Sequence, residues 1–98
     1  MSISEARIET VHSQRYLGQL CKHFGHRIPA TQEGDTGRIQ FPAGICSLSA
    51  EPGLLVLRME AEDELARRLV EGVVGSHLER FAFRESLTIT WAPQSAAA

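Results

Sequence analysis

Two segments of the chain place apolar residues three or four positions apart, which is the spacing of an amphipathic helix. In the first, over residues 13–24, Ser13 stands where an N-cap would accept a hydrogen bond from an unpaired amide. Gly25 follows the last apolar position and predicts a left-handed residue that closes the helix. The inward stripe of this helix is predicted to be Tyr16, Leu17, Leu20, Cys21 and Phe24.

The second helical segment begins after three acidic residues, 62–64, whose charge is favourable at a helix N-terminus. Gly72 and Gly75 fall inside the segment and weaken its helix propensity. The segment still keeps a helical stripe that we expect to face the core: Leu65, Leu69, Val70, Val73, His77 and Phe81.

The remaining runs alternate apolar and polar residues with the period of a strand. Turn-forming residues separate several of them, notably at 34–37 (GDTG) and 51–53 (EPG). The order β-α-β-β-β-β-α-β predicts an α+β two-layer sandwich, a mostly antiparallel sheet with two helices on one face. We expect one domain over residues 1–92 and a flexible tail over 93–98. The predicted strands cover residues 6–11, 27–32, 38–41, 45–50, 54–61 and 86–91.

Two helices can cover only one face of such a sheet, so the other face is expected to be open. Leu54 and Val56, joined by Ile45, project from that open face in the predicted alternation. An apolar patch on a domain of 98 residues is typical of an interface. The pattern therefore predicts a homodimer, since a twofold dimer is the commonest assembly.

Composition narrows the class of protein. Hydrophobic residues make up 43% and charged residues 22% of the chain, as in ordinary globular domains, and the formal net charge is −2. A nucleic-acid-binding protein usually carries a basic excess, so we expect no nucleic-acid partner. The N-terminus resembles no signal peptide and no apolar run is long enough to cross a membrane, which favours a cytoplasmic protein with no membrane partner.

The segment CKHFGH, residues 21–26, offers ligands that suit zinc. On a helix, however, Cys21 and His23 diverge by roughly 200° and cannot share one ion. We therefore expect no metal and no cofactor, and two reduced, buried thiols at Cys21 and Cys46. The D-T-G of residues 35–37 also occurs in aspartic proteases, but a hairpin turn accounts for it here.

The strongest candidate site lies where the two predicted helices end. Two arginines interleaved with aromatic rings suit planar anions, through bidentate hydrogen bonds and stacking. Alternatively Arg80 and Arg84 pair with Glu79 or Glu85 and bind nothing. The expected anion-binding cleft consists of His23, His26, His77, Arg80 and Arg84, with Tyr16 and Trp91 as aromatic walls.

Three segments together resemble the bacterial family called domain of unknown function 2218: RYLGQLCKHFGH, RIQFPAG, and HLERFAFRE followed by a tryptophan. The resemblance implies a small cytoplasmic protein, or a domain appended to siderophore-interacting ferric reductases. Some members carry an aldolase label, but Lys22 is the sole lysine here and lies on a polar helix face. A Schiff-base lysine would need a desolvated pocket.

These observations favour a non-enzymatic accessory or binding protein, linked to siderophore iron through an anionic small molecule. An alternative is a small lyase or hydrolase with His77 as general base, because an imidazole titrates near neutrality. A second alternative is a purely structural dimer.

Overall fold

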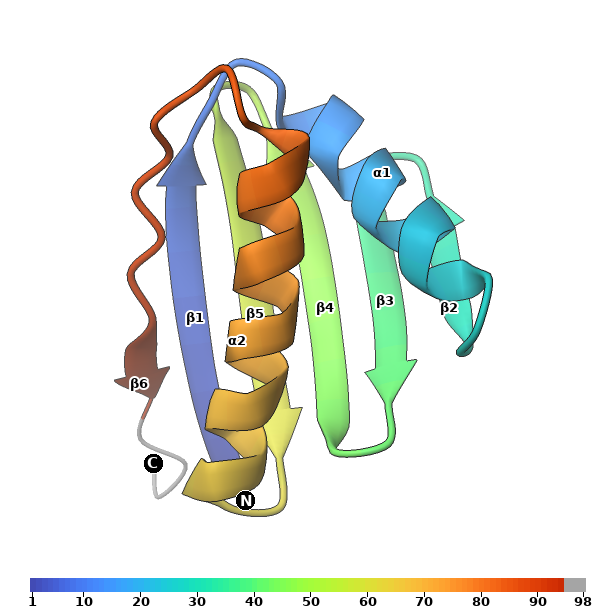
Figure 1. The fold of residues 1–98 in the computed structure, drawn as a ribbon, viewed down its shortest axis with the longest axis vertical. Coiled ribbons are helices and arrows are strands. Elements are labelled where there is room, and N and C mark those ends of the chain that lie inside the picture. Colours follow the sequence, from blue (N-terminus) through green and yellow to red (C-terminus); the bar gives the residue numbers. More distant parts are fainter. Residues whose placement is uncertain (95–98) are drawn as a thin grey trace.

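The computed structural model describes residues 1–94 and has two layers, a sheet and a pair of helices on one of its faces (Figure 1). The strands form one sheet in the order β2-β3-β4-β5-β1-β6, and every pairing is antiparallel. This architecture confirms the predicted α+β sandwich. The elements are β1 (Ser2–Glu9), α1 (Ser13–Gly25), β2 (Ala30–Glu33), β3 (Thr36–Phe41), β4 (Gly44–Glu51), β5 (Leu54–Ala61), α2 (Glu64–Phe81) and β6 (Ala92–Gln94).

The two hairpin turns predicted from GDTG and EPG are confirmed. Gly34 and Gly53 have φ angles of 57° and 73°, a left-handed conformation that favours glycine. They join β2 to β3 and β4 to β5. Asp35 therefore sits in a hairpin turn, as the sequence predicted, and its backbone oxygen accepts from the amide of Ala50 at 2.7 Å.

The core lies between the helices and the inward side chains of the central strands. Leu55 and Leu57 of β5 are fully buried, as are Leu17 and Leu20 of α1. Gly37 of β3 lets α1 approach the sheet closely, because a methyl group there would lie 2.6 Å from the Cys21 sulfur. Both cysteine side chains are buried in this core, as their apolar stripes predicted.

The ends of α1 differ from the prediction. His12, not Ser13, is the N-cap, and no side-chain hydrogen bond caps the helix. The Ser13 hydroxyl instead donates to the Glu51 carbonyl at 2.8 Å, which fastens the helix start to the β4–β5 turn. Gly25 ends the helix but is not left-handed, and His26 after it is still right-handed.

The predicted inward stripe of α2 is wrong in part. Val70 is buried, but the Leu65 and Leu69 side chains are 79% and 61% exposed. Arg67 and Glu71 are buried in their place, where they bond to each other and to β1. This polar network turns the helix away from the setting that hydrophobicity alone predicts.

The strands nearest the two ends of the chain also differ from the prediction. β1 begins at Ser2 and ends at Glu9, so it starts four residues earlier than expected. The last strand is not 86–91 but the short β6, whose Pro93 and Gln94 pair with β1. The predicted tail over 93–98 is therefore wrong for residues 93 and 94, while 95–98 lie outside the described residues.

The face of the sheet opposite the helices carries a mixture of side chains. Leu54, Val56 and Ile45 lie there half-buried, which is where the alternation placed them. Charged residues interleave with them, including an ion pair between Arg58 and Glu60. Whether this face joins two copies stays a prediction. Within residues 1–94, no helix combines the length and hydropathy that a membrane span requires.

Candidate ligand-binding site

A pocket of about 580 Å³ lies where the end of α1 meets the C-terminal half of α2. The last turn of α1 and the turn after it form one wall, and α2 forms the other. Phe41 at the end of β3 contributes from the sheet. The lining residues are His23, Phe24, His26, Arg27, Ile28, Phe41, Val73 and His77.

Two histidines from different helices lie side by side in the lining of this pocket. The rings of His23 and His77 are 4.8 Å apart between centroids, with planes tilted by 42°. Nδ1 of His77 lies 2.7 Å from the Val73 carbonyl, and because a carbonyl only accepts, Nδ1 carries the hydrogen. Nε2 of His77 is then the nitrogen left to meet a ligand.

The charged side chains that act on His23 of this histidine pair are all basic. The pKa of His23 is lowered, first by partial desolvation and then by the nearby positive charges of His77, His26, Arg80 and Arg27. No carboxylate contributes to this shift. Among residues 1–94, the ion pairs involve neither Arg27 nor Arg80. The site therefore gathers basic side chains, and among the described residues neither of its arginines has a carboxylate partner.

Aromatic rings supply the apolar part of the pocket. Phe24 packs edge-to-face on Phe41 at 4.9 Å and on His77 at the same centroid distance. Phe81 packs edge-to-face on His23 at 5.6 Å. These contacts hold both imidazole rings against apolar neighbours, and this explains the partial desolvation of His23.

The structure brings together three of the seven predicted site residues, His23, His26 and His77, in the lining of one pocket. Arg80 lies close enough to lower the pKa of His23. Arg84 is elsewhere: its guanidinium stacks 5.4 Å from the Phe83 ring. Both Phe83 and Arg84 are exposed, so Arg84 does not belong to the pocket.

Trp91 lies on the other side of α2. It lines a separate groove of about 520 Å³ that also involves Gly72, Gly75 and Glu79 of that helix. The prediction of Trp91 as a wall of the cleft is therefore wrong. The reason is that Trp91 leads into β6, at the sheet edge beyond β1, whereas the pocket opens toward α1.

Tyr16 is not a wall of the pocket either. Its side chain is 4% exposed, and its hydroxyl donates to Glu85. Thr10 donates to the same carboxylate at 3.1 Å, so this cluster ties the chain after α2 to the end of β1. Burial and the neighbouring carboxylate raise the pKa of Tyr16 to about 12.

This cluster also decides the alternative reading of the arginines. The Glu85 carboxylate is taken by Tyr16 and Thr10. Among the described residues, neither Arg80 nor Arg84 forms an ion pair with it or with Glu79. The structure therefore does not contain the alternative arrangement, in which Arg80 and Arg84 pair with Glu79 or Glu85, among the described residues.

Sequence reasoning missed several residues of the pocket. Arg27 and Ile28 follow the helix end, in a stretch predicted to be an edge strand. Phe41 was counted only as part of a strand. A signal was present in the position of Phe41 before the PAG turn, because the last residue of a strand lies at the rim of the sheet.

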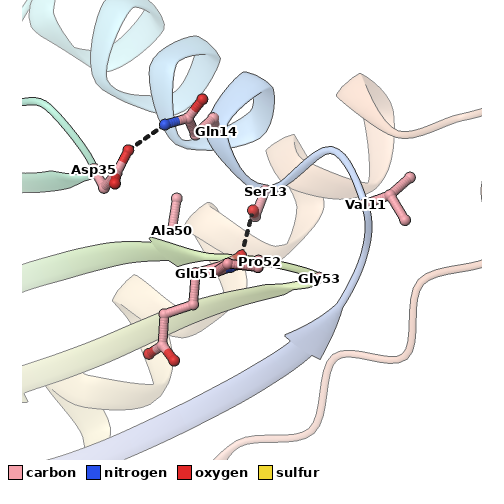
Figure 2. Close-up of a pocket in the computed structure, with 8 residues that line it drawn as sticks. All are labelled: Val11, Ser13, Gln14, Asp35, Ala50, Glu51, Pro52 and Gly53. Carbon is pink, nitrogen blue, oxygen red and sulfur yellow. Dashed lines mark hydrogen bonds between the residues drawn. The ribbon is translucent and has the colours of Figure 1, made fainter.

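A smaller pocket of about 290 Å³ lies at the other end of α1 (Figure 2). Gln14 of the helix donates to Asp35 of the β2–β3 turn, and Ser13 donates to the Glu51 carbonyl. Figure 2 shows both bonds crossing between the helix and the sheet. These polar groups satisfy one another, so we assign them to fastening the turns.

The thiols are not ligands in this arrangement. Cys21 packs inward, with its sulfur 3.7 Å from the Thr31 carbonyl, while His23 is exposed. Desolvation raises the pKa of both Cys21 and Cys46, which disfavours the thiolate that a metal needs. Within the described part of the chain, no three side chains of the types His, Cys, Asp and Glu gather as metal ligands.

Comparison with known proteins agrees with the resemblance seen in the sequence. The model of a family described as "Uncharacterized protein conserved in bacteria (DUF2218)" matches residues 5–92, so the chain belongs to this family. A solved structure, the NMR structure of PA4090 from Pseudomonas aeruginosa, is 34% identical, with 100% of both chains covered and a TM-score of 0.80. No curated protein matches the chain.

Proposed function

We propose that this protein binds a small organic anion with a planar, apolar body, in the pocket between α1 and α2. The observation that carries the proposal is a cluster of basic side chains, three histidines and Arg27, placed over aromatic rings, with no carboxylate among the described residues that line the pocket. The volume of about 580 Å³ is in the range of small-molecule sites.

The charged groups of such a ligand have several partners. Arg27 offers a planar guanidinium, which suits a carboxylate in bidentate fashion. His23 and His77 add imidazole donors when protonated, and a bound anion favours that state. The ligand thus supplies the negative charge that the protein itself leaves out.

The apolar groups narrow the ligand class further. Phe24, Phe41 and Ile28 offer an apolar surface to a ring but nothing to a compact polyacid such as citrate. The arrangement favours an aromatic carboxylate or a catecholate. A catecholate is also the chemistry by which the suggested link to siderophore iron would operate, because catechol rings are a common iron-binding group of siderophores.

The lining favours binding over catalysis. Among the described residues that line the pocket, none is a carboxylate, a hydroxyl or a thiol. The Val73 carbonyl fixes the tautomer of His77, but no carboxylate among the described lining residues would offset the charge of a protonated base. We therefore prefer an accessory or binding role to a reaction with His77 as general base.

The test is an NMR titration of the histidine side-chain signals with salicylate, dihydroxybenzoate, citrate and uncharged salicylamide. Salicylate and dihydroxybenzoate should shift the signals of His23 and His77, and the other two compounds should not. Tryptophan fluorescence is not a suitable readout, since Trp91 lies in the groove on the other side of α2.

Matched arginine variants make the titration specific. Arg27→Gln should weaken binding about tenfold, because an exposed charge-assisted hydrogen bond contributes about 1.5 kcal/mol. Arg84→Gln removes the same charge outside the pocket and should leave affinity within about twofold, by the weakness of screened surface charges. Equal weakening by both variants, or no shift with any aromatic anion, would show that the pocket is not the site.

A further inference from the structure

The stretch 86–91 follows the edge of β1 without joining the sheet. Figure 1 shows it descending beside β1 until it reaches β6. Strand pairing starts only at Ala92, and among the described residues no backbone hydrogen bond links 86–91 to β1. The edge of β1 above β6 therefore has no strand against it.

The side chains of this stretch nevertheless alternate as in a strand. Leu87, Ile89 and Trp91 are half-buried, whereas Thr88 and Thr90 are exposed. Such a period of two is expected of a strand with one covered face. The sequence is thus suited to pairing that this conformation does not make.

The backbone of β1 shows which groups are free to pair. The Thr10 amide donates to the Gly53 carbonyl at 3.1 Å, across the side of β1 that faces β5. In an antiparallel pair the hydrogen-bonding residues alternate, so Ala6 and Ile8 also face β5. The N–H and C=O groups of Arg7 and Glu9 then point toward the open edge.

β6 sets the register in which a longer strand would pair. Ile3 is opposite Gln94 and Glu5 is opposite Ala92, while Pro93, which has no N–H, is opposite Ser4. Proline thus occupies a position where this edge requires no donor, in agreement with the alternation.

The β6 register can be extended from Ala92 back toward Ser86, and the residues that it then places opposite each other are compatible in burial. It places Thr90 opposite Arg7, and Ile89 opposite the fully buried Ile8. A cavity of about 680 Å³ lies between the two segments on the outer side. Its lining consists of outward residues of both segments, Arg7, Glu9, Ser86, Thr88 and Thr90, together with Leu54 of β5.

We propose that residues 86–91 are a strand latch, which pairs with the edge of β1 in the β6 register and releases it again. In the released state shown here, β1 offers unpaired donors and acceptors, the feature by which sheet edges take up an added strand. The occupant is the chain's own segment, since β6 already holds one end of it in register.

The first test is amide hydrogen exchange of the unmodified protein, followed by NMR. The latch predicts slowed exchange at Thr88, Thr90, Arg7 and Glu9, by about tenfold if the paired state outweighs the released state by about ten to one. The amide of Ile89 points away from β1 in this register and serves as the internal control. If all these amides exchange as fast as that of Ile89, the latch does not form and the proposal fails.

The second test is disulfide trapping. Arg7→Cys with Thr90→Cys places two thiols at paired positions, with Cα atoms about 5.5 Å apart, which a disulfide can bridge. The control, Arg7→Cys with Thr88→Cys, is displaced by two residues, at about 7 to 8 Å.

Fast intramolecular crosslinking of the first pair alone supports the latch. Crosslinking only between two molecules shows that a second copy supplies the strand and overturns the assignment of the occupant. Equal crosslinking rates for the two cysteine pairs would also overturn the proposal. They would show that the two segments touch but do not pair in one fixed register.

Discussion

Replacement of Glu71 by leucine tests the most unusual feature of the core, a charged pair inside the helix–sheet interface. Arg67 donates from Nε to the Glu71 carboxylate at 3.0 Å, and the side chains are only 7% and 9% exposed. Ser4 of β1 donates to the same carboxylate. Among residues 1–94, the change therefore removes the only carboxylate that is buried with Arg67.

The expected loss of stability depends on the partners that Arg67 retains in the variant. Loss of one partner of a buried pair costs about 3 to 5 kcal/mol. Arg67 retains a hydrogen bond to the Ser2 hydroxyl at 2.8 Å and a long contact of 3.9 Å with the exposed Glu64. We therefore expect the lower end, about 3 kcal/mol, or a fall in Tm of about 12 to 24 °C for a domain of this size.

This loss of unfolding free energy is measured by urea unfolding of four proteins: wild type, Glu71→Leu, Arg67→Met and the double variant. The double variant should recover to within about 1 kcal/mol of wild type, since two apolar side chains replace a buried pair well. Arg68 and Glu64 form a matched exposed pair on the same helix at 3.1 Å, and Arg68→Met should cost less than about 1 kcal/mol. If Glu71→Leu costs no more than that control, the pair is not buried in solution and the setting of α2 is wrong.

Three further outcomes are expected. Gly37→Ala should lower stability by about 1 to 3 kcal/mol because the new methyl group meets Cys21, whereas Gly72→Ala, which meets nothing, should raise it by about 0.5 to 1 kcal/mol in urea unfolding. Light scattering should give a dimer mass that Leu54→Asp converts to a monomer mass; a monomer of the unmodified protein would contradict the predicted interface. Salicylate affinity should increase as the pH falls from about 7 to about 5. The reason is that a bound anion raises the lowered pKa of His23, so that protons are taken up on binding. Calorimetry that shows no proton uptake would contradict this prediction.

The central part of the fold was predictable because its signals are local. Alternation along β4 and β5, with turns at Gly34 and Gly53, specifies consecutive antiparallel strands. The setting of α2 was not predictable in this way. It depends on Ser4, which lies 67 residues before Glu71, and no local pattern reveals a bond of that separation.

The same distinction applies to the site. His23 and His77 were predicted together because both lie near helix ends on one side of the sheet, and their rings are in fact 4.8 Å apart. Tyr16 and Trp91 were assigned to the wrong surroundings because the sequence does not say on which side of α2 each one lies. Position around a helix relative to its neighbours is a tertiary property.

The placement of charge explains why composition gave so little warning of this pocket. The chain has a formal net charge of −2, yet His23, His26 and Arg27 stand together at the end of α1. No acidic side chain is among the described residues that line the pocket, and Glu71 and Glu85 have partners of their own: Arg67 for Glu71, and Tyr16 and Thr10 for Glu85. A slightly acidic protein can in this way present a local excess of positive charge, and a ligand responds to that local field rather than to the total.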